Sequence, residues 1–140
     1  MRIARIIDLS GGIRHGVPTD DSHIRPLAMS PLDDLTLLDG QIEVQRWLAP
    51  VAPPNIFCIG LNYRAHAKET GAALPAQPVI FMKPTTTIND PMVPIVLPDA
   101  CEHGPEVDYE AELAVIIGRS GKDIPVERAL EHVLGYTCAN

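Results

Sequence analysis

The stretch that decides the fold is Glu106-Val-Asp-Tyr-Glu-Ala-Glu-Leu-Ala-Val-Ile-Ile117, in which residues 107–117 have the strongest strand pattern of the sequence. Strand side chains alternate between two faces, so the four acids share one face and the apolar side chains share the other. The acidic face carries Glu106, Asp108, Glu110 and Glu112, and it continues with Ala114 and Ile116. A face that passes from carboxylates to apolar residues enters the core, so we expect Glu112 to lie at a buried margin.

Closely spaced carboxylates at such a margin suggest a metal site. Two buried acids at positions i and i+2 have Cα atoms about 7 Å apart, and they repel each other unless a proton or a cation bridges them. Carboxylate oxygens without histidine or thiolate partners favour a hard ion such as Mg²⁺, with Ca²⁺ and Mn²⁺ as substitutes. The alternative is an acidic edge strand whose charges keep the protein soluble.

The composition is that of a globular protein with an excess of acids. The 140 residues include 11 Lys+Arg and 18 Asp+Glu, a net charge of −7 that disfavours nucleic acid as a partner. No apolar run is long enough to span a membrane and no signal peptide is recognisable, so we expect a cytoplasmic protein without a membrane partner. Cys58, Cys101 and Cys138 fit neither a disulfide nor a zinc pattern, and the Cys101-x-His103 pair supplies too few ligands for a metal.

The first third of the chain predicts a hairpin followed by two helices. Residues 1–28 contain two short alternating runs around a Ser-Gly-Gly turn, which is typical of a β-hairpin. Ser30-Pro31 and leucines at helical spacing predict a helix over residues 30–40. A second helix is expected over residues 41–48.

A proline-rich linker follows these elements. Residues 49–55 contain three prolines, which neither continue a helix nor pair in a central strand. We therefore expect two domains, a small β/α N-terminal domain over residues 1–50 and a second domain over residues 51–140.

The second domain is predicted to be mixed β with short helices, an α+β class. Apolar runs predict strands over residues 56–59 and 78–83, and a weaker strand between prolines over 91–97. Capping residues predict a short helix over 62–70, and an amphipathic pattern predicts a helix over 123–134.

Three side chains in this domain are candidates for chemistry. His66 and Glu69 stand at i and i+3 on one helix face, where the carboxylate can orient the imidazole so that it activates water. The alternative is that His66 and Glu69 are an incidental pair on a surface helix. Lys83 ends an apolar strand, where it can bind a substrate carboxylate or simply extend into solvent.

Five motifs of this domain, in this order and spacing, closely resemble the fumarylacetoacetate hydrolase superfamily. They are Gly60-Leu-Asn-Tyr63, His66-x-x-Glu69, Phe81-Met-Lys-Pro84, Asp108-Tyr-Glu-Ala-Glu-Leu113 and Gly135-Tyr-Thr137. The resemblance runs from about Ile56 to the C-terminus. Residues 1–50 look like the small, variable N-terminal domain of bacterial members.

The resemblance implies a mixed β-roll, a homodimer, and a Mg²⁺ or Mn²⁺ ion held by three carboxylates. Glu110 and Glu112 match the first two ligands, and the third would directly follow Asn140. The resemblance further assigns His66 and Glu69 to water activation on a mobile lid helix, and Lys83 to the substrate. It therefore implies that the chain corresponds to the N-terminal half of such an enzyme, with an incomplete β-roll.

The implied activity is a metal-dependent hydrolase or isomerase that acts on a 2-oxo acid of the acylpyruvate, fumarylacetoacetate or hydroxymuconate type in the breakdown of aromatic compounds. The ion would bind the carboxylate and keto oxygens and stabilise an enolate, while the His-Glu pair delivers water or moves a proton. The motifs do not choose among these substrates. The alternative is a catalytically inactive fragment, or one partner half of a split enzyme.

Overall fold

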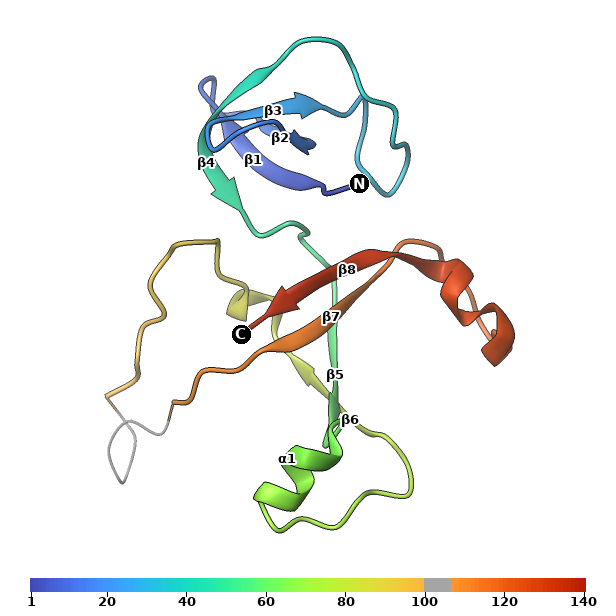
Figure 1. The fold of residues 1–140 in the computed structure, drawn as a ribbon. Helices are drawn as coiled ribbons and strands as arrows, with labels where there is room; N and C mark the ends of the chain where they lie inside the picture. Colours follow the sequence, from blue (N-terminus) through green and yellow to red (C-terminus); the bar gives the residue numbers. More distant parts are fainter. Residues whose placement is uncertain (100–106) are drawn as a thin grey trace.

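Four antiparallel strands at the N-terminal end close into a small barrel (Figure 1). The computed structural model describes residues 1–99 and 107–140. The barrel strands run in the order β1 (Ala4–Asp8), β2 (Ile13–Pro18), β3 (His23–Pro26) and β4 (Ile42–Leu48). The first two are the predicted hairpin. Ile6 and Ile24 are fully buried at the centre of this barrel, so it has its own small core.

Both helices expected over residues 30–48 are wrong. Ser30 does start a turn, because its carbonyl oxygen accepts hydrogen bonds from the N–H groups of Asp33 and Asp34. The turn stops there, since the Asp34 carboxylate binds the Thr36 N–H at 3.1 Å and the next residue forms a β-bridge to Leu27. The second segment is β4, which is antiparallel to β1. The N-terminal region is thus a β barrel without an α-helix in the described residues, not the expected β/α domain.

A network around Asp8 fixes the first hairpin turn. The Asp8 carboxylate accepts hydrogen bonds from the Ser10 hydroxyl and from the N–H groups of Ser10 and Gly12, both at 2.9 Å, and it pairs with Arg14 at 2.8 Å. These donors, first Ser10 and then Arg14, hold the pKa of Asp8 far below its ordinary value. Asp20 behaves similarly, because the Ser22 N–H lowers the pKa of its carboxyl to about 2.

We expect the barrel to lose stability between about pH 4 and pH 2. A carboxylate whose pKa is depressed by folding stabilises the fold above its unfolded value of about 3.9, and that contribution disappears as the pH falls toward the folded value. Asp8→Asn should lower the unfolding midpoint at pH 7. It should also make the loss of stability between about pH 4 and pH 2 less steep. The fluorescence of Trp47, the only tryptophan and a β4 residue paired with Ile6, reports this unfolding.

Asp33→Asn is the matched control, because the Asp33 side chain is exposed and has no recorded hydrogen bond among the described residues. If the stability of Asp8→Asn and of Asp33→Asn depends on pH in the same way below about pH 4, the network around Asp8 contributes no pH-dependent stability.

The segment over residues 49–55 has no regular structure and leads into the second part of the chain. Asp90 connects the two parts: its carboxylate accepts a hydrogen bond from the Ala49 N–H at 2.9 Å and pairs with Arg46 of β4 at 3.3 Å. One carboxylate thus ties the end of the barrel to a loop that comes some forty residues later.

The second part consists of two separate antiparallel pairs. β5 (Ile56–Gly60) pairs with β6 (Val79–Lys83), and β7 (Glu112–Ile117) pairs with β8 (Val133–Ala139). α1 (Arg64–Glu69) follows β5 and lies at the end of the molecule opposite the barrel (Figure 1). The described residues also contain two short 3₁₀ helices, η1 (Thr85–Thr87) after β6 and η2 (Val126–His132) between β7 and β8.

Three expected elements differ from those observed. The weak strand over residues 91–97 is absent, because its prolines supply no N–H and the Asn89 amide instead donates to the carbonyl oxygens of Val93 and Pro94. The helix over 123–134 is the shorter η2. It ends at His132, whose carbonyl oxygen accepts a 2.9 Å hydrogen bond from the Gly118 N–H and so directs the chain into β8.

The strand expected over residues 107–117 begins only at Glu112. β8 ends opposite this residue, at Ala139, so the described part of the chain offers residues 107–111 no strand to pair with. The remaining expectations in this region, the strands near 56–59 and 78–83 and the helix near 62–70, are confirmed. The structure is therefore mostly β with few short helices.

Both hairpins of the second part expose large apolar side chains. The most exposed on the two pairs are Phe57 at 64%, Ile80 at 65%, Leu113 at 61% and Ile117 at 62%. Within residues 1–99 and 107–140, no helix has the length and apolar character needed to cross a bilayer. Cys58 and Cys138 are free thiols. Cys101, His103 and Glu106 lie outside the described residues.

Candidate functional site

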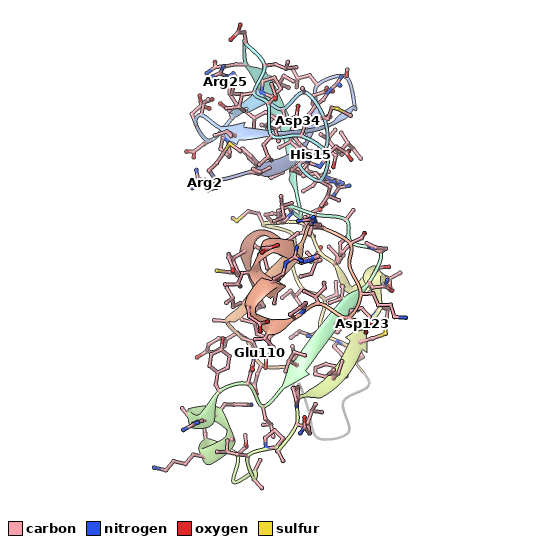
Figure 2. The ribbon with its side chains drawn as sticks, turned by 90° about the vertical axis from the view of Figure 1, so that its right-hand side faces the viewer. Arg2, His15, Arg25, Asp34, Glu110 and Asp123 are labelled. Carbon is pink, nitrogen blue, oxygen red and sulfur yellow. The ribbon has the colours of Figure 1, made fainter. Side chains whose placement is uncertain are left out.

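The predicted metal ligands Glu110 and Glu112 lie beside the end of β8. Glu112 opens β7 and pairs with Ala139, and the Glu110 N–H donates a 2.6 Å hydrogen bond to the side-chain oxygen of Asn140. Figure 2 labels Glu110 on the lower body of the molecule, away from the barrel. Both glutamates are exposed, so the expectation of a buried margin at Glu112 is wrong.

The side-chain oxygens at this place are of the kind that binds a hard divalent ion. Glu110 and Glu112 supply two carboxylates, and Asn140 adds a neutral oxygen next to them. Mg²⁺ is commonly bound by one or two carboxylates, with water and substrate oxygens completing its octahedron. The described residues contain no cluster of three or more histidine, cysteine, aspartate or glutamate side chains placed for a metal. Glu110 and Glu112 therefore stay candidate ligands, which no third acidic, imidazole or thiol side chain joins within the described residues.

α1 carries His66 and Glu69, as predicted. It is a short helix held by little packing, because Ala67 is its only buried residue. Tyr63 precedes it without a side-chain cap, and the Thr70 hydroxyl closes its last turn on the His66 carbonyl oxygen at 2.9 Å. The side chains of His66 and Glu69 are exposed, and no hydrogen bond or ion pair between them is recorded within the described ranges.

Lys83 lies at the far end of the β5–β6 hairpin from α1. It pairs with Ile56, whereas α1 follows Gly60, which pairs with Val79. Four strand steps of about 3.4 Å separate the two ends. Lys83 is exposed, and for its ammonium group the described part of the chain records no ion pair. The structure therefore places Glu110 and Glu112 beside the end of β8, and His66 with Glu69 on α1, whereas Lys83 lies at the other end of the β5–β6 pair from α1.

A hollow of about 330 Å³ at the base of α1 was not foreseen from the sequence. It is lined by the turn after β5, including Gly60 and Asn62, by Arg64, and by the loop from Leu74 to the start of β6. Leu61 adopts a positive φ of 53° in this turn, which sends the chain sharply from β5 into α1. The Gly60-Leu-Asn-Tyr63 motif could have indicated this hollow from the sequence, because it contributes lining residues and Arg64, another lining residue, directly follows it.

Comparison with known proteins identifies the class to which this fold and these residues belong. A family model described as fumarylacetoacetate (FAA) hydrolase C-terminal matches residues 55–140. The chain therefore belongs to the fumarylacetoacetate hydrolase family, as the motifs indicated.

Individual relatives agree with this assignment. The chain is 47% identical over 94 residues to oxaloacetate tautomerase fahd2 of Xenopus laevis, covering 66% of this chain and 28% of the relative. It is 44% identical over 106 residues to caffeoylpyruvate hydrolase of Neonothopanus nambi, covering 71% and 36%. A structure of 5-carboxymethyl-2-hydroxymuconate delta-isomerase from Mycobacterium smegmatis has 36% identity and a TM-score of 0.75, covering 99% of this chain and 53% of the other.

This chain covers only part of the length of each of these relatives. The chain spans between a quarter and a half of the length of the first curated relatives it matches, and about half of the solved structures. These relatives include a hydrolase, a tautomerase and an isomerase, so one framework carries more than one reaction in this family.

Proposed function

We propose that this chain supplies the metal-binding and proton-transferring part of an enzyme that hydrolyses or isomerises a 2-oxo acid of the acylpyruvate type. The observation that carries the proposal is the juxtaposition of Glu110, Glu112 and Asn140 at the joined ends of β7 and β8. Caffeoylpyruvate and oxaloacetate, named for two relatives, are both 2-oxo acids. The similarity of this chain to the two relatives supports a 2-oxo acid as the substrate but does not select a particular one.

The glutamates would hold a Mg²⁺ or Mn²⁺ ion, which when bound supplies positive charge to the adjacent oxygens of a 2-oxo acid. Glu110 and Glu112 are exposed, so substrate oxygens have access to an ion at this place. The Asn140 side chain holds the backbone at Glu110 beside the end of β8 through its 2.6 Å hydrogen bond.

His66 would take or donate the proton in the reaction, with Glu69 on the same face of α1 orienting its ring. The loose packing of α1 allows this helix to move toward bound substrate and to exclude water from it. Lys83 would bind an anionic end of the substrate. Its place at the other end of the hairpin requires a substrate that extends away from the reacting bond, or a closing movement of α1.

A second candidate function is that of one half of a two-chain enzyme. The apolar faces of both hairpins, with Phe57 and Leu113 more than 60% exposed, favour burial against further strands. In that case the 140-residue chain by itself would be inactive and prone to aggregation, and a complementary half would restore solubility and turnover.

One experiment addresses both candidates. The chain is purified alone, and it is also fused to the part of the Mycobacterium smegmatis relative that it does not cover, which we term the complemented enzyme. Acylpyruvate cleavage and oxaloacetate tautomerisation are followed by absorbance with Mg²⁺ and with a chelator. We expect Mg²⁺-dependent turnover in the complemented enzyme. A soluble complemented enzyme without turnover on any 2-oxo acid would refute the proposal.

A further inference from the structure

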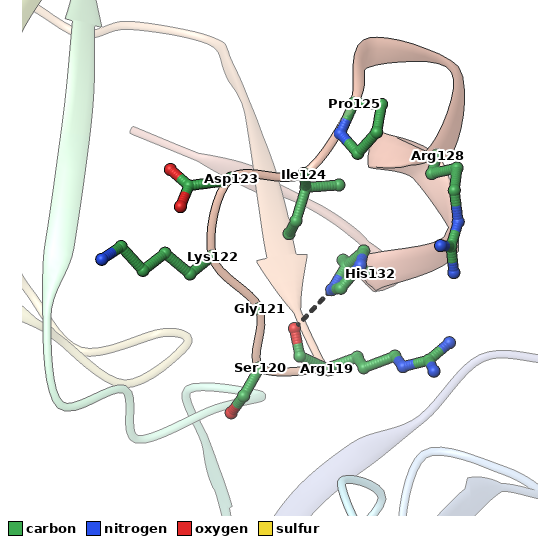
Figure 3. Close-up of a pocket in the computed structure, with 9 residues that line it drawn as sticks. All are labelled: Arg119, Ser120, Gly121, Lys122, Asp123, Ile124, Pro125, Arg128 and His132. Atoms are coloured by element: carbon green, nitrogen blue, oxygen red, sulfur yellow. Dashed lines mark hydrogen bonds between the residues drawn. The ribbon is translucent and has the colours of Figure 1, made fainter.

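A second hollow lies at the opposite end of the β7–β8 hairpin from Glu110 and Glu112. It has a volume of about 270 Å³ and is formed by the loop that follows β7 together with residues of η2 (Figure 3). The five steps of β7 between Glu112 and Ile117 place it roughly 17 Å from the paired glutamates. The lining residues fall within the family match over residues 55–140, but none of the five motifs quoted from the sequence includes them.

Positive charge gathers at this hollow, although the protein as a whole is acidic. Arg119 and Arg128 extend to the same side of the loop, past His132, whereas Lys122 and Asp123 extend to the other side (Figure 3). Arg128 uses Nε and Nη2 on one oxygen of Glu131, at 3.1 and 3.0 Å, so its Nη1 remains available. For Arg119 no ion pair is recorded among the residues that the structure describes.

The loop also presents backbone donors. For the N–H groups of Ser120, Gly121 and Lys122, the described residues provide no recorded hydrogen-bond acceptor. Asp123 has a positive φ of 54°, which folds the loop back on itself. Unpaired N–H groups of a folded-back loop commonly bind anions in proteins.

His132 forms the buried floor of the hollow. His132 is only 9% exposed, and its Nδ1 donates a 2.9 Å hydrogen bond to the Arg119 carbonyl oxygen, so the proton of the neutral ring resides on Nδ1 and Nε2 can accept. A Cβ on Gly121 would come within 2.7 Å of the His132 ring and 2.5 Å of Ile124. Glycine thus allows the loop to pack directly on this histidine, which binds the backbone carbonyl oxygen of Arg119.

We propose that this hollow binds a phosphate group, held by Arg119, Arg128 and the N–H groups of residues 120–122. Guanidinium groups match phosphate oxygens in planar, paired geometry. Two guanidinium groups and three N–H groups offer more donors than the two oxygens of a carboxylate accept, which favours phosphate. The proposal is independent of the function proposed above, since it uses none of the same side chains.

The test is titration of the 140-residue chain with inorganic phosphate, followed by NMR at the Gly121 amide and the His132 ring. We expect saturable shifts at both positions and a dissociation constant in the millimolar range or tighter. Arg119→Gln and Arg128→Gln should each weaken binding at least about tenfold, because each removes charge-assisted hydrogen bonds. Glu131→Gln should tighten binding roughly two- to fivefold, because it releases Arg128 from its ion pair.

Arg25→Gln is the matched control, since it removes the same charge from an exposed Arg–Asp pair in the barrel. Acetate at equal ionic strength is the control for a carboxylate. The proposal is overturned if phosphate produces no saturable shift, if acetate binds as well, or if Arg25→Gln weakens binding as much as Arg119→Gln. Circular dichroism of each variant confirms that the fold is retained.

Discussion

Replacement of either paired glutamate should abolish metal-dependent turnover. In the complemented enzyme, we expect Glu110→Gln or Glu112→Gln to lower kcat/KM for an acylpyruvate at least about a thousandfold, because each removes one carboxylate of an ion that stabilises developing negative charge. The fold should persist, since both side chains are exposed and neither contributes to the core. The measurement is steady-state absorbance with saturating Mg²⁺.

Glu43→Gln is the matched control, because Glu43 is an exposed glutamate on the barrel strand β4. It should leave kcat/KM unchanged. Residual turnover above a tenth of the wild-type value in Glu110→Gln or Glu112→Gln would remove that glutamate from the metal site.

Loss of His66 should reduce turnover without a comparable loss of substrate affinity. For His66→Gln in the complemented enzyme we expect kcat to fall roughly 10²- to 10⁴-fold with KM changed little, as for removal of a general base. Glu69→Gln should have a smaller effect on kcat, because it removes only the group that orients the ring.

Lys68→Gln is the control for this helix. Lys68 is exposed in the same turn of α1 and carries no proposed role, so its replacement tests the general effect of altering the helix. An equal loss through KM alone in His66→Gln would assign His66 to substrate recognition instead of proton transfer.

The sequence patterns correctly predicted those strands whose apolar side-chain pattern agrees with the strand pairing in the structure. The runs near β5 and β6 are apolar and bounded by Gly, Asn or Pro, and the structure pairs them from Ile56 opposite Lys83 to Gly60 opposite Val79. The failures lie in short segments where helical and strand periods are hard to tell apart. Eight residues over 41–48 satisfy both patterns, and pairing with β1 and β3 makes this segment a strand.

The sequence proposes candidate site residues, but it does not predict how they are arranged. The alternation of acids and the family resemblance together proposed Glu110 and Glu112 as ligands, yet the start of β7 depends on where β8 ends, which is a tertiary fact. The exposure of Glu112 likewise could not be inferred, because it depends on what packs against that face. No local pattern could reveal that Lys83 and α1 occupy opposite ends of one hairpin, since this follows from strand register.

Binding of Mn²⁺ tests the central claim most directly, because it measures the metal site without depending on the choice of substrate. The free Mn²⁺ signal in electron paramagnetic resonance is followed while the ion is titrated into the complemented enzyme, its Glu110→Gln/Glu112→Gln double variant, and the Glu43→Gln control. We predict one site per chain in the complemented enzyme and in the control, and affinity at least about a hundredfold weaker in the double variant. Equal Mn²⁺ affinity in the complemented enzyme and the double variant would contradict the assignment of Glu110 and Glu112 as metal ligands.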